Sequence, residues 1–222
     1  PRIGGVSLAD SGCSIMSYAS ALTAIYTRRH EQDVYVLPEH IATAITDKYG
    51  KLSRFFTPGS GFNGFGLDEN ITKDISGIYD VAILYSKDYK PSGEGVISAE
   101  QVNTVAKNNG CVVGSMLNKA HLVAITGVST EGTEYVANTY KYAREHISGA
   151  PEHTKLKYYS TVFDSSSVEL KDGKVYLNGE CNFDIGDITN VSIKGEDIPV
   201  ERVVVNDDDL LPIYEYRYDV TM

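Results

Sequence analysis

Apolar positions near the start of the chain recur every three or four residues. Ile15, Tyr18, Leu22 and Ile25 follow this spacing, which places them on one face of an α-helix. The pattern predicts a helix from about residue 13 to residue 27, with this face turned toward a core.

Two further helices are predicted from the residues at their ends. Pro38 is favoured in a first helical turn and Gly50 is favoured just after a last one, so we expect a helix between them. Ser98 and Gln101 form a capping-box pattern, which predicts a helix that stops at Asn109-Gly110.

Short apolar runs predict strands between and after these helices. Residues 80–86 form one such run, and residues 111–117, 121–129 and 134–140 form three more in quick succession. The turn "TEGT" would join the last two strands as a hairpin. Helices followed by antiparallel strands predict an α+β fold. Residues 54–70, rich in glycine and aromatic residues, are expected to form a long loop.

The sequence pattern becomes entirely strand-like after about residue 150, and we expect a domain boundary near Pro151. Asp172-Gly173 separates two alternating runs, which predicts a hairpin, and three later segments also alternate. We therefore divide the chain into residues 1–150 and an all-β tail at 151–222. The tail is either an extension of the first sheet or a small accessory domain, and the sequence leaves both open.

Composition narrows the possible partners. The 222 residues carry a formal net charge of -10, which opposes binding to nucleic acid. No apolar run approaches the length of a membrane span. Three cysteines cannot all pair in disulfides with one another, and no CxxC motif or Cys/His cluster predicts a zinc site. We expect no metal and no cofactor. The chain begins at Pro1 without a signal peptide, which predicts a removed leader or a domain excised from a longer protein.

Cys13 stands at the start of the first predicted helix, where unpaired N–H groups favour a thiolate. A nucleophilic thiol needs an imidazole nearby and a third polar group to orient the imidazole. Among the five histidines, only His121 begins a strongly apolar strand, whereas His146 lies in a segment predicted as a polar loop. The hairpin would bring Asn138 beside His121. Cys111 is expected to be a core residue.

These residues carry a resemblance to a known family. "GCSIMSYASAL" resembles the start of the first helix in bacterial and phage C39-like cysteine peptidases, a branch of the papain-like fold, and "AHLVAITGV" with "EYVANTY" resembles their histidine strand and the next strand. The resemblance covers roughly residues 5–142. It implies a papain-like core with N-terminal helices on an antiparallel sheet, Cys13 as nucleophile, His121 as base, Asn138 as orienting residue and an acyl-enzyme intermediate. "HLVAITG" also fits NlpC/P60 proteins, but its 108-residue separation from Cys13 favours the C39-like group.

The family pattern also implies a substrate and shows one departure. Bacterial cell-wall peptides or a protein linker would be the substrate, and an extracellular, cell-envelope or virion-associated location is favoured over the cytoplasm. Where the family often has an oxyanion-binding glutamine, this chain has Ser7, whose hydroxyl could donate together with the backbone N–H of Cys13. This departure keeps an alternative open: a catalytically inactive binding or structural module of a larger assembly, such as a phage virion or a secretion machine.

Overall fold

The computed structural model describes residues 2–3, 6–7, 12–50, 56–57, 61–62, 69–86, 96–116, 122–128, 134–138, 145–148, 156–206 and 211–221. Within these residues the α-helices are α2 (Cys13–His30), α3 (Pro38–Tyr49), α4 (Glu69–Ile78) and α5 (Ala99–Lys107). Three of these four described helices were predicted. Gly50 ends α3 with a left-handed φ of 74°, and Ser98 and Gln101 form the expected capping box of α5, so these end signals are confirmed.

Helix α4 was not predicted, although its sequence contains a helical signal. Ile71, Ile75 and Ile78 follow helical spacing, and Ile71 and Ile75 are buried. The helix also buries Asp74, which accepts hydrogen bonds from Lys48 and Tyr49 of α3. Polar residues of this kind weaken the apolar stripe that identifies a buried helix from sequence.

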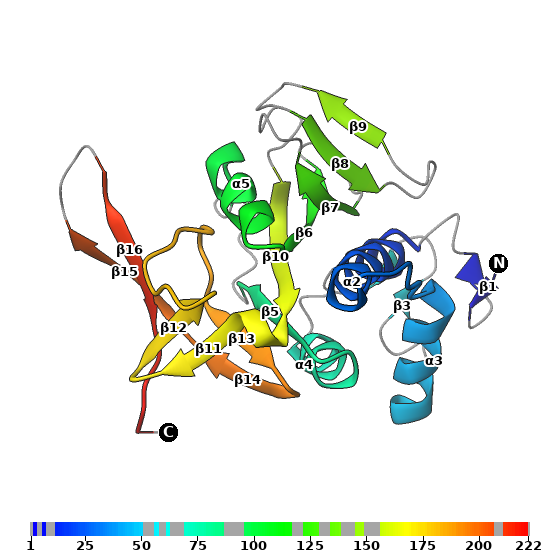
Figure 1. Cartoon of the computed structure of the whole chain (residues 1–222). Helices are drawn as coiled ribbons and strands as arrows, with labels where there is room; N and C mark the ends of the chain where they lie inside the picture. Colours follow the sequence, from blue (N-terminus) through cyan, green and yellow to red (C-terminus); the bar gives the residue numbers. More distant parts are fainter. Residues whose placement is uncertain are drawn as a thin grey trace.

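Eight of the sixteen described strands lie in one large antiparallel sheet (Figure 1). Its spatial order is β14 (Glu196–Pro199), β13 (Asn190–Ile193), β5 (Val81–Tyr85), β10 (Leu156–Asp164), β6 (Cys111–Met116), β7 (Leu122–Val128), β8 (Glu134–Asn138) and β9 (Glu145–Ser148). Every pairing in this sheet is antiparallel, and the α+β class is confirmed. His146 lies in β9 opposite Val136, so its placement in a loop was wrong; a polar edge strand lacks the apolar alternation that predicts strands.

Strand β10 lies near the middle of this sheet and was also not predicted. It pairs with β5 on one side and with β6 on the other. Two of its residues, Ser160 and Thr161, are polar and almost fully buried. Their hydroxyl groups bond to Tyr18 and to the Leu84 carbonyl, so partners distant in sequence make a polar central strand possible.

A second, four-stranded sheet is built from the remaining strands of the tail. Its order is β11 (Val168–Lys171), β12 (Lys174–Leu177), β16 (Ile213–Arg217) and β15 (Glu201–Asn206). The predicted hairpin turn is present: Asp172 and Gly173 both have a positive φ, of 52° and 74°, as a type I′ turn requires. The tail thus adds β10, β13 and β14 to the large sheet and forms the small sheet with its other four strands.

The short strands near the chain start form two small ladders. These are β1 (Arg2–Ile3) with β2 (Val6–Ser7), and β3 (Phe56–Thr57) with β4 (Gly61–Phe62). The second ladder lies in the segment that was predicted to be a loop throughout.

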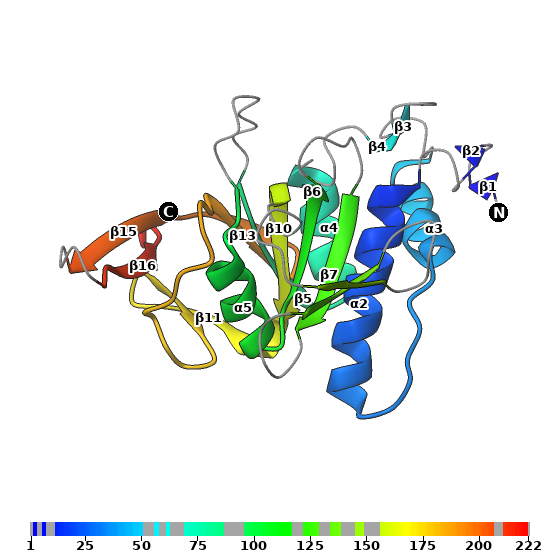
Figure 2. The ribbon, with the colours of Figure 1, turned by 90° about the horizontal axis from the view of Figure 1, so that it is seen from above.

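Both faces of the central strands of the large sheet are covered (Figure 2). Helices α2, α3 and α4 contribute to the core cluster on one face, where Ile83 and Leu122 point. Helix α5 and the small sheet contribute to the cluster on the other face, with Leu84 and Val123. Side chains alternate between the faces of a strand, so a strand covered on both sides is apolar at consecutive positions. This explains why residues 81–85 are all buried.

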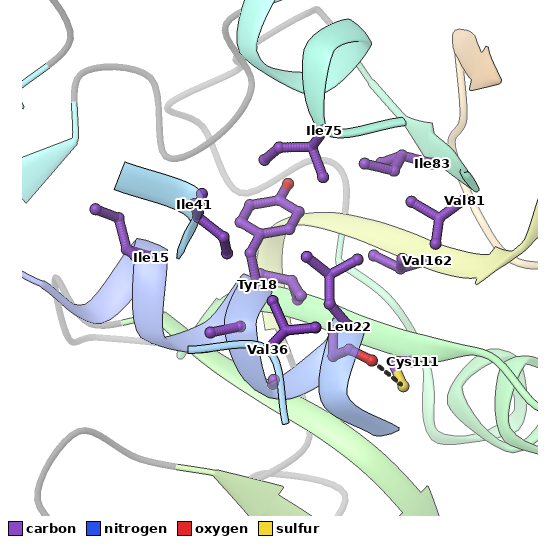
Figure 3. Packing of buried hydrophobic residues seen from close by; sticks show 14 of the residues in the cluster. Ile15, Tyr18, Leu22, Val36, Ile41, Ile75, Val81, Ile83, Cys111 and Val162 are labelled. Carbon is purple, nitrogen blue, oxygen red and sulfur yellow. Dashed lines mark hydrogen bonds between the residues drawn. The ribbon is translucent and has the colours of Figure 1, made fainter. Parts of the chain in front are cut away.

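Tyr18 connects α2 to the centre of the large sheet (Figure 3). Its ring is buried among Ile41, Ile75 and neighbouring apolar side chains, and its hydroxyl lies 2.8 Å from the Ser160 hydroxyl. Burial raises the pKa of Tyr18 to about 12, because the phenolate would lose its hydration. The neutral phenol is therefore part of the folded structure.

Replacing Tyr18 with phenylalanine should change how stability depends on pH. An unfolded tyrosine ionises near pH 10, whereas the pKa of folded Tyr18 is about 12. Between these values the folded state holds more protons, so its stability falls as pH rises, by about 1–2 kcal/mol at pH 11 from this residue. Tyr18→Phe should lose about 1 kcal/mol at pH 8 through the missing hydrogen bond, yet lose less than wild type from pH 8 to pH 11.

Urea unfolding at the two pH values measures this difference. Tyr35→Phe is the control, since the Tyr35 side chain is 67% exposed. An equal fall in stability for Tyr18→Phe and wild type would contradict the role given to the buried phenol.

Candidate active site

Cys13 is the first residue of α2 and lies at an end of the helix that attracts negative charge. The Gly12 carbonyl accepts the first helical bond from the Met16 N–H at 2.9 Å, and no side chain caps the helix start. The first turn holds no acidic residue, while the last turn holds Arg28, Arg29 and His30. The basic residues of the last turn thus suit the helix dipole, and no carboxylate in the first turn competes for its positive end.

The surroundings of Cys13 are mainly apolar, but its side chain is not sealed. Cys13 is partly buried and packs against the core cluster, whereas Ser14 and Ile15 are almost fully buried. A cavity of about 10 Å³, room for about one water molecule, lies beside these two residues. Its other lining residues are Tyr18, Ile41, Ile45, Ile71 and Ile75.

Helix α2 runs over the large sheet in the same direction as β7. Near the end of the helix, Arg28 donates to the carbonyl of Thr126 in β7 and to that of Asn109 just before β6. Five residues after Cys13, the Tyr18 hydroxyl reaches Ser160 in β10. The end of the helix therefore lies near the end of β7, and the start of the helix points toward the start of β7.

One row of paired residues across the sheet shows how far along the strands the Tyr18 contact lies. Ser160 pairs with Val113, Val113 with Ala124, and Ala124 with Asn138. The buried members Val113 and Ala124 belong to the core cluster beneath α2. Position 138 therefore lies in the row that Tyr18 contacts.

The predicted hairpin of β7 and β8 is confirmed, but its register differs from the expected one. Asn138 was expected beside His121; the ladder instead pairs it with Ala124, three residues later in the strand. A register shift between Ile125 and Gly127 interrupts the ladder, and a β-bulge of this kind is not evident from the sequence pattern.

The side chains of three predicted site residues, Ser7, His121 and Asn138, lie outside the described part of the structure. His121 lies outside the described residues, directly before the first residue of β7, Leu122. Ser7 is described in its backbone only, which pairs with Arg2 in the small ladder of β1 and β2. The structure thus positions Cys13 and the strand register of Asn138, while the contacts of His121 and Ser7 stay predictions.

The other two thiols have different surroundings. Cys111 is fully buried in β6, as predicted, with its sulfur 3.8 Å from the Ala21 carbonyl oxygen and 3.7 Å from the Arg28 guanidinium. Burial raises the pKa of the Cys111 thiol, and Arg28 opposes part of this rise. Cys181 is partly exposed in the tail, beside Asn182.

Metal-binding clusters and membrane-spanning helices are two further features that bear on function. Among the described residues, no group of three or more His, Cys, Asp or Glu side chains is arranged to hold a metal ion. Within the same part of the chain, no helix has the length and apolar character needed to cross a membrane.

Comparison with protein-family models, with curated proteins and with solved structures finds no match to this chain. The functional class proposed for this chain therefore rests on its own residues and their geometry.

The three thiols should differ in their reaction with iodoacetamide. In the folded protein, Cys13 and Cys181 should be labelled, because each is partly exposed, and Cys111 should be protected by complete burial. In urea all three should react. Mass spectrometry of the labelled peptides measures this order, and labelling of Cys111 in the folded protein as fast as Cys181 would contradict the described packing.

Proposed function

We propose that this chain is a papain-like cysteine peptidase, similar to the C39-like group, with Cys13 as its nucleophile. The observation that carries the proposal is the position of Cys13: it begins a long buried helix, is partly exposed, and lies toward the start of β7, the strand that follows His121. A thiol at such a helix start has the unpaired N–H groups that stabilise a thiolate and a developing oxyanion.

Spacing along the two elements supports a meeting of Cys13 and His121. Tyr18 and Ala124 are connected through one row of the sheet. Cys13 precedes Tyr18 by five residues, roughly 7–8 Å of helix. Leu122, the residue after His121, precedes Ala124 by two residues, roughly 7 Å of strand. Cys13 and Leu122 are thus at similar levels, on chain segments that run in the same direction.

The chain before β7 must meet one condition for the His121 imidazole to reach Cys13. Leu122 and Ala124 pack beneath α2, while Val123 and Ile125 pack on the opposite face. Regular strand alternation would direct position 121 to the same face as Val123. The imidazole can reach Cys13 only if the chain departs from this alternation before Leu122.

The row in which Asn138 lies sets a further condition for the proposed triad. Its partner Ala124 lies three residues from His121, roughly 10 Å along the strand. An orienting contact from Asn138 to the imidazole therefore requires that the His121 segment fold back toward this row.

The proposed reaction is acyl transfer to sulfur followed by hydrolysis. The Cys13 thiolate attacks the peptide carbonyl carbon, and a C–S bond forms while Ser7 and the Cys13 N–H stabilise the oxyanion. The C–N bond then breaks, and the leaving amine takes a proton from the His121 imidazolium. His121 next removes a proton from water, whose oxygen attacks the thioester carbon. The C–S bond then breaks, which releases the carboxylic acid and restores the thiolate of Cys13 beside the imidazolium of His121. Bacterial cell-wall peptides or a protein linker are the proposed substrates.

Thiol chemistry and hydrolysis together test this proposal. In a Cys181→Ser background, Cys13 should react with iodoacetamide at pH 6, and His121→Ala should slow this reaction at least about tenfold by removing its imidazole partner. His146→Ala, at a histidine in the edge strand β9, is the matched control.

Zymograms containing casein or bacterial cell walls should show clearing by the wild type. Cys13→Ser should reduce hydrolysis by at least about a thousandfold. Clearing that is unchanged in Cys13→Ser would contradict the proposal. Slow labelling that His121→Ala does not alter, without clearing on either substrate, would favour the inactive module.

A further inference from the structure

The hairpin of β15 and β16 extends away from the rest of the molecule (Figure 2). These strands pair with each other from Glu201–Arg217 to Asn206–Ile213, whereas β12 pairs with β16 only at Arg217. Most of the hairpin is therefore a two-stranded ribbon. Such ribbons are marginally stable in water unless something covers them.

Strand β15 is the last strand of the small sheet, with no neighbour on its outer side among the described residues. Its consecutive residues Val204 and Val205 are 49% and 47% exposed. The register of β15 against β16 shifts between Val204 and Asn206, so a β-bulge interrupts the regular alternation here and leaves two neighbouring apolar side chains open. Leu211 and Ile213, at the start of the returning strand, are also exposed.

The outer strand β14 of the large sheet is four residues long and contains Pro199, which has no N–H to offer. Strand β15 has six residues and contains neither proline nor lysine. From Glu201 to Val204 it pairs with β16 in regular register, and its bulge lies only beyond Val204, so among the described residues this first part of its outer edge is open to a further strand.

The charge near this edge is negative. Arg202 is already paired with Asp184 at 2.8 Å and with Asp187 at 3.5 Å. Exposed Glu201 has no ion pair among the described residues, and the sequence that joins β15 to β16 contains three consecutive aspartates. Together with the net charge of -10, this opposes pairing with a second copy and favours a basic partner.

We propose that the β15 edge binds an extended, apolar segment of another polypeptide that is flanked by lysine or arginine. The segment adds as a further strand along the regular part of β15, covers the exposed Val204 and Val205, and places its cations near Glu201. This inference does not depend on the proposed peptidase activity.

The test uses the whole chain and a synthetic peptide, acetyl-Lys-Lys-Val-Val-Thr-Val-Val-Lys-Lys-amide, with a fluorescent label and detection by anisotropy. The peptide should bind at least about tenfold more tightly than its version with glutamates in place of lysines. N-methylation at alternate residues should abolish binding in one register and leave it in the other, because every second N–H faces the neighbouring strand.

Variants of the chain locate the binding site. Val204→Lys should weaken peptide binding at least about tenfold, by removing apolar contact and adding a repelling charge. Val220→Lys is the matched control, since Val220 is also exposed but lies beyond the end of β16, and it should bind as the wild type does. Val204→Thr keeps the strand preference and should retain most of the binding.

Three results would overturn the proposal. These are a lack of binding by the lysine-flanked peptide, equal weakening by Val204→Lys and Val220→Lys, and equal tolerance of both N-methylation registers. Light scattering that shows a dimer dissociated by Val204→Lys would also overturn it, because the edge would then serve a second copy of the chain.

Discussion

Burial of both faces of the central strands in the large sheet determines where the helices and the small sheet can pack. These central strands, β5, β10, β6 and β7, bury residues on both sides. Helix α2 covers one face, and small residues such as Ser17 and Ala21 on its buried side permit a close approach. The Tyr18–Ser160 hydrogen bond then fixes the level of the helix over the sheet.

The position of Cys13 follows from this packing. With Tyr18 held over β10 and Arg28 bound to the carbonyl of Thr126, the direction and level of α2 are determined. The start of the helix is thereby brought toward the start of β7, and no acidic side chain in the first turn offsets the positive potential there. A peptidase site here would depend on core packing as much as on the reacting groups.

Local signals in the sequence predicted much of the fold. Pro38 with Gly50, Ser98 with Gln101, and Asp172 with Gly173 each act within a few residues, and their elements were predicted well. Strand β10 was missed because Ser160 and Thr161 find their partners only after folding. The same limit applies to the site: Cys13 could be placed from its helix, but the register of Asn138 depends on the ladder of β7 and β8, whose shift the sequence does not reveal.

The most direct test of a catalytic pair of Cys13 and His121 is the distance from the Cys13 sulfur to the nearer ring nitrogen of His121 in a crystal structure. We expect a separation of about 4 Å or less, with the imidazole on the α2 side of the sheet. An imidazole on the opposite face, packed toward α5 with Val123, would contradict this expectation.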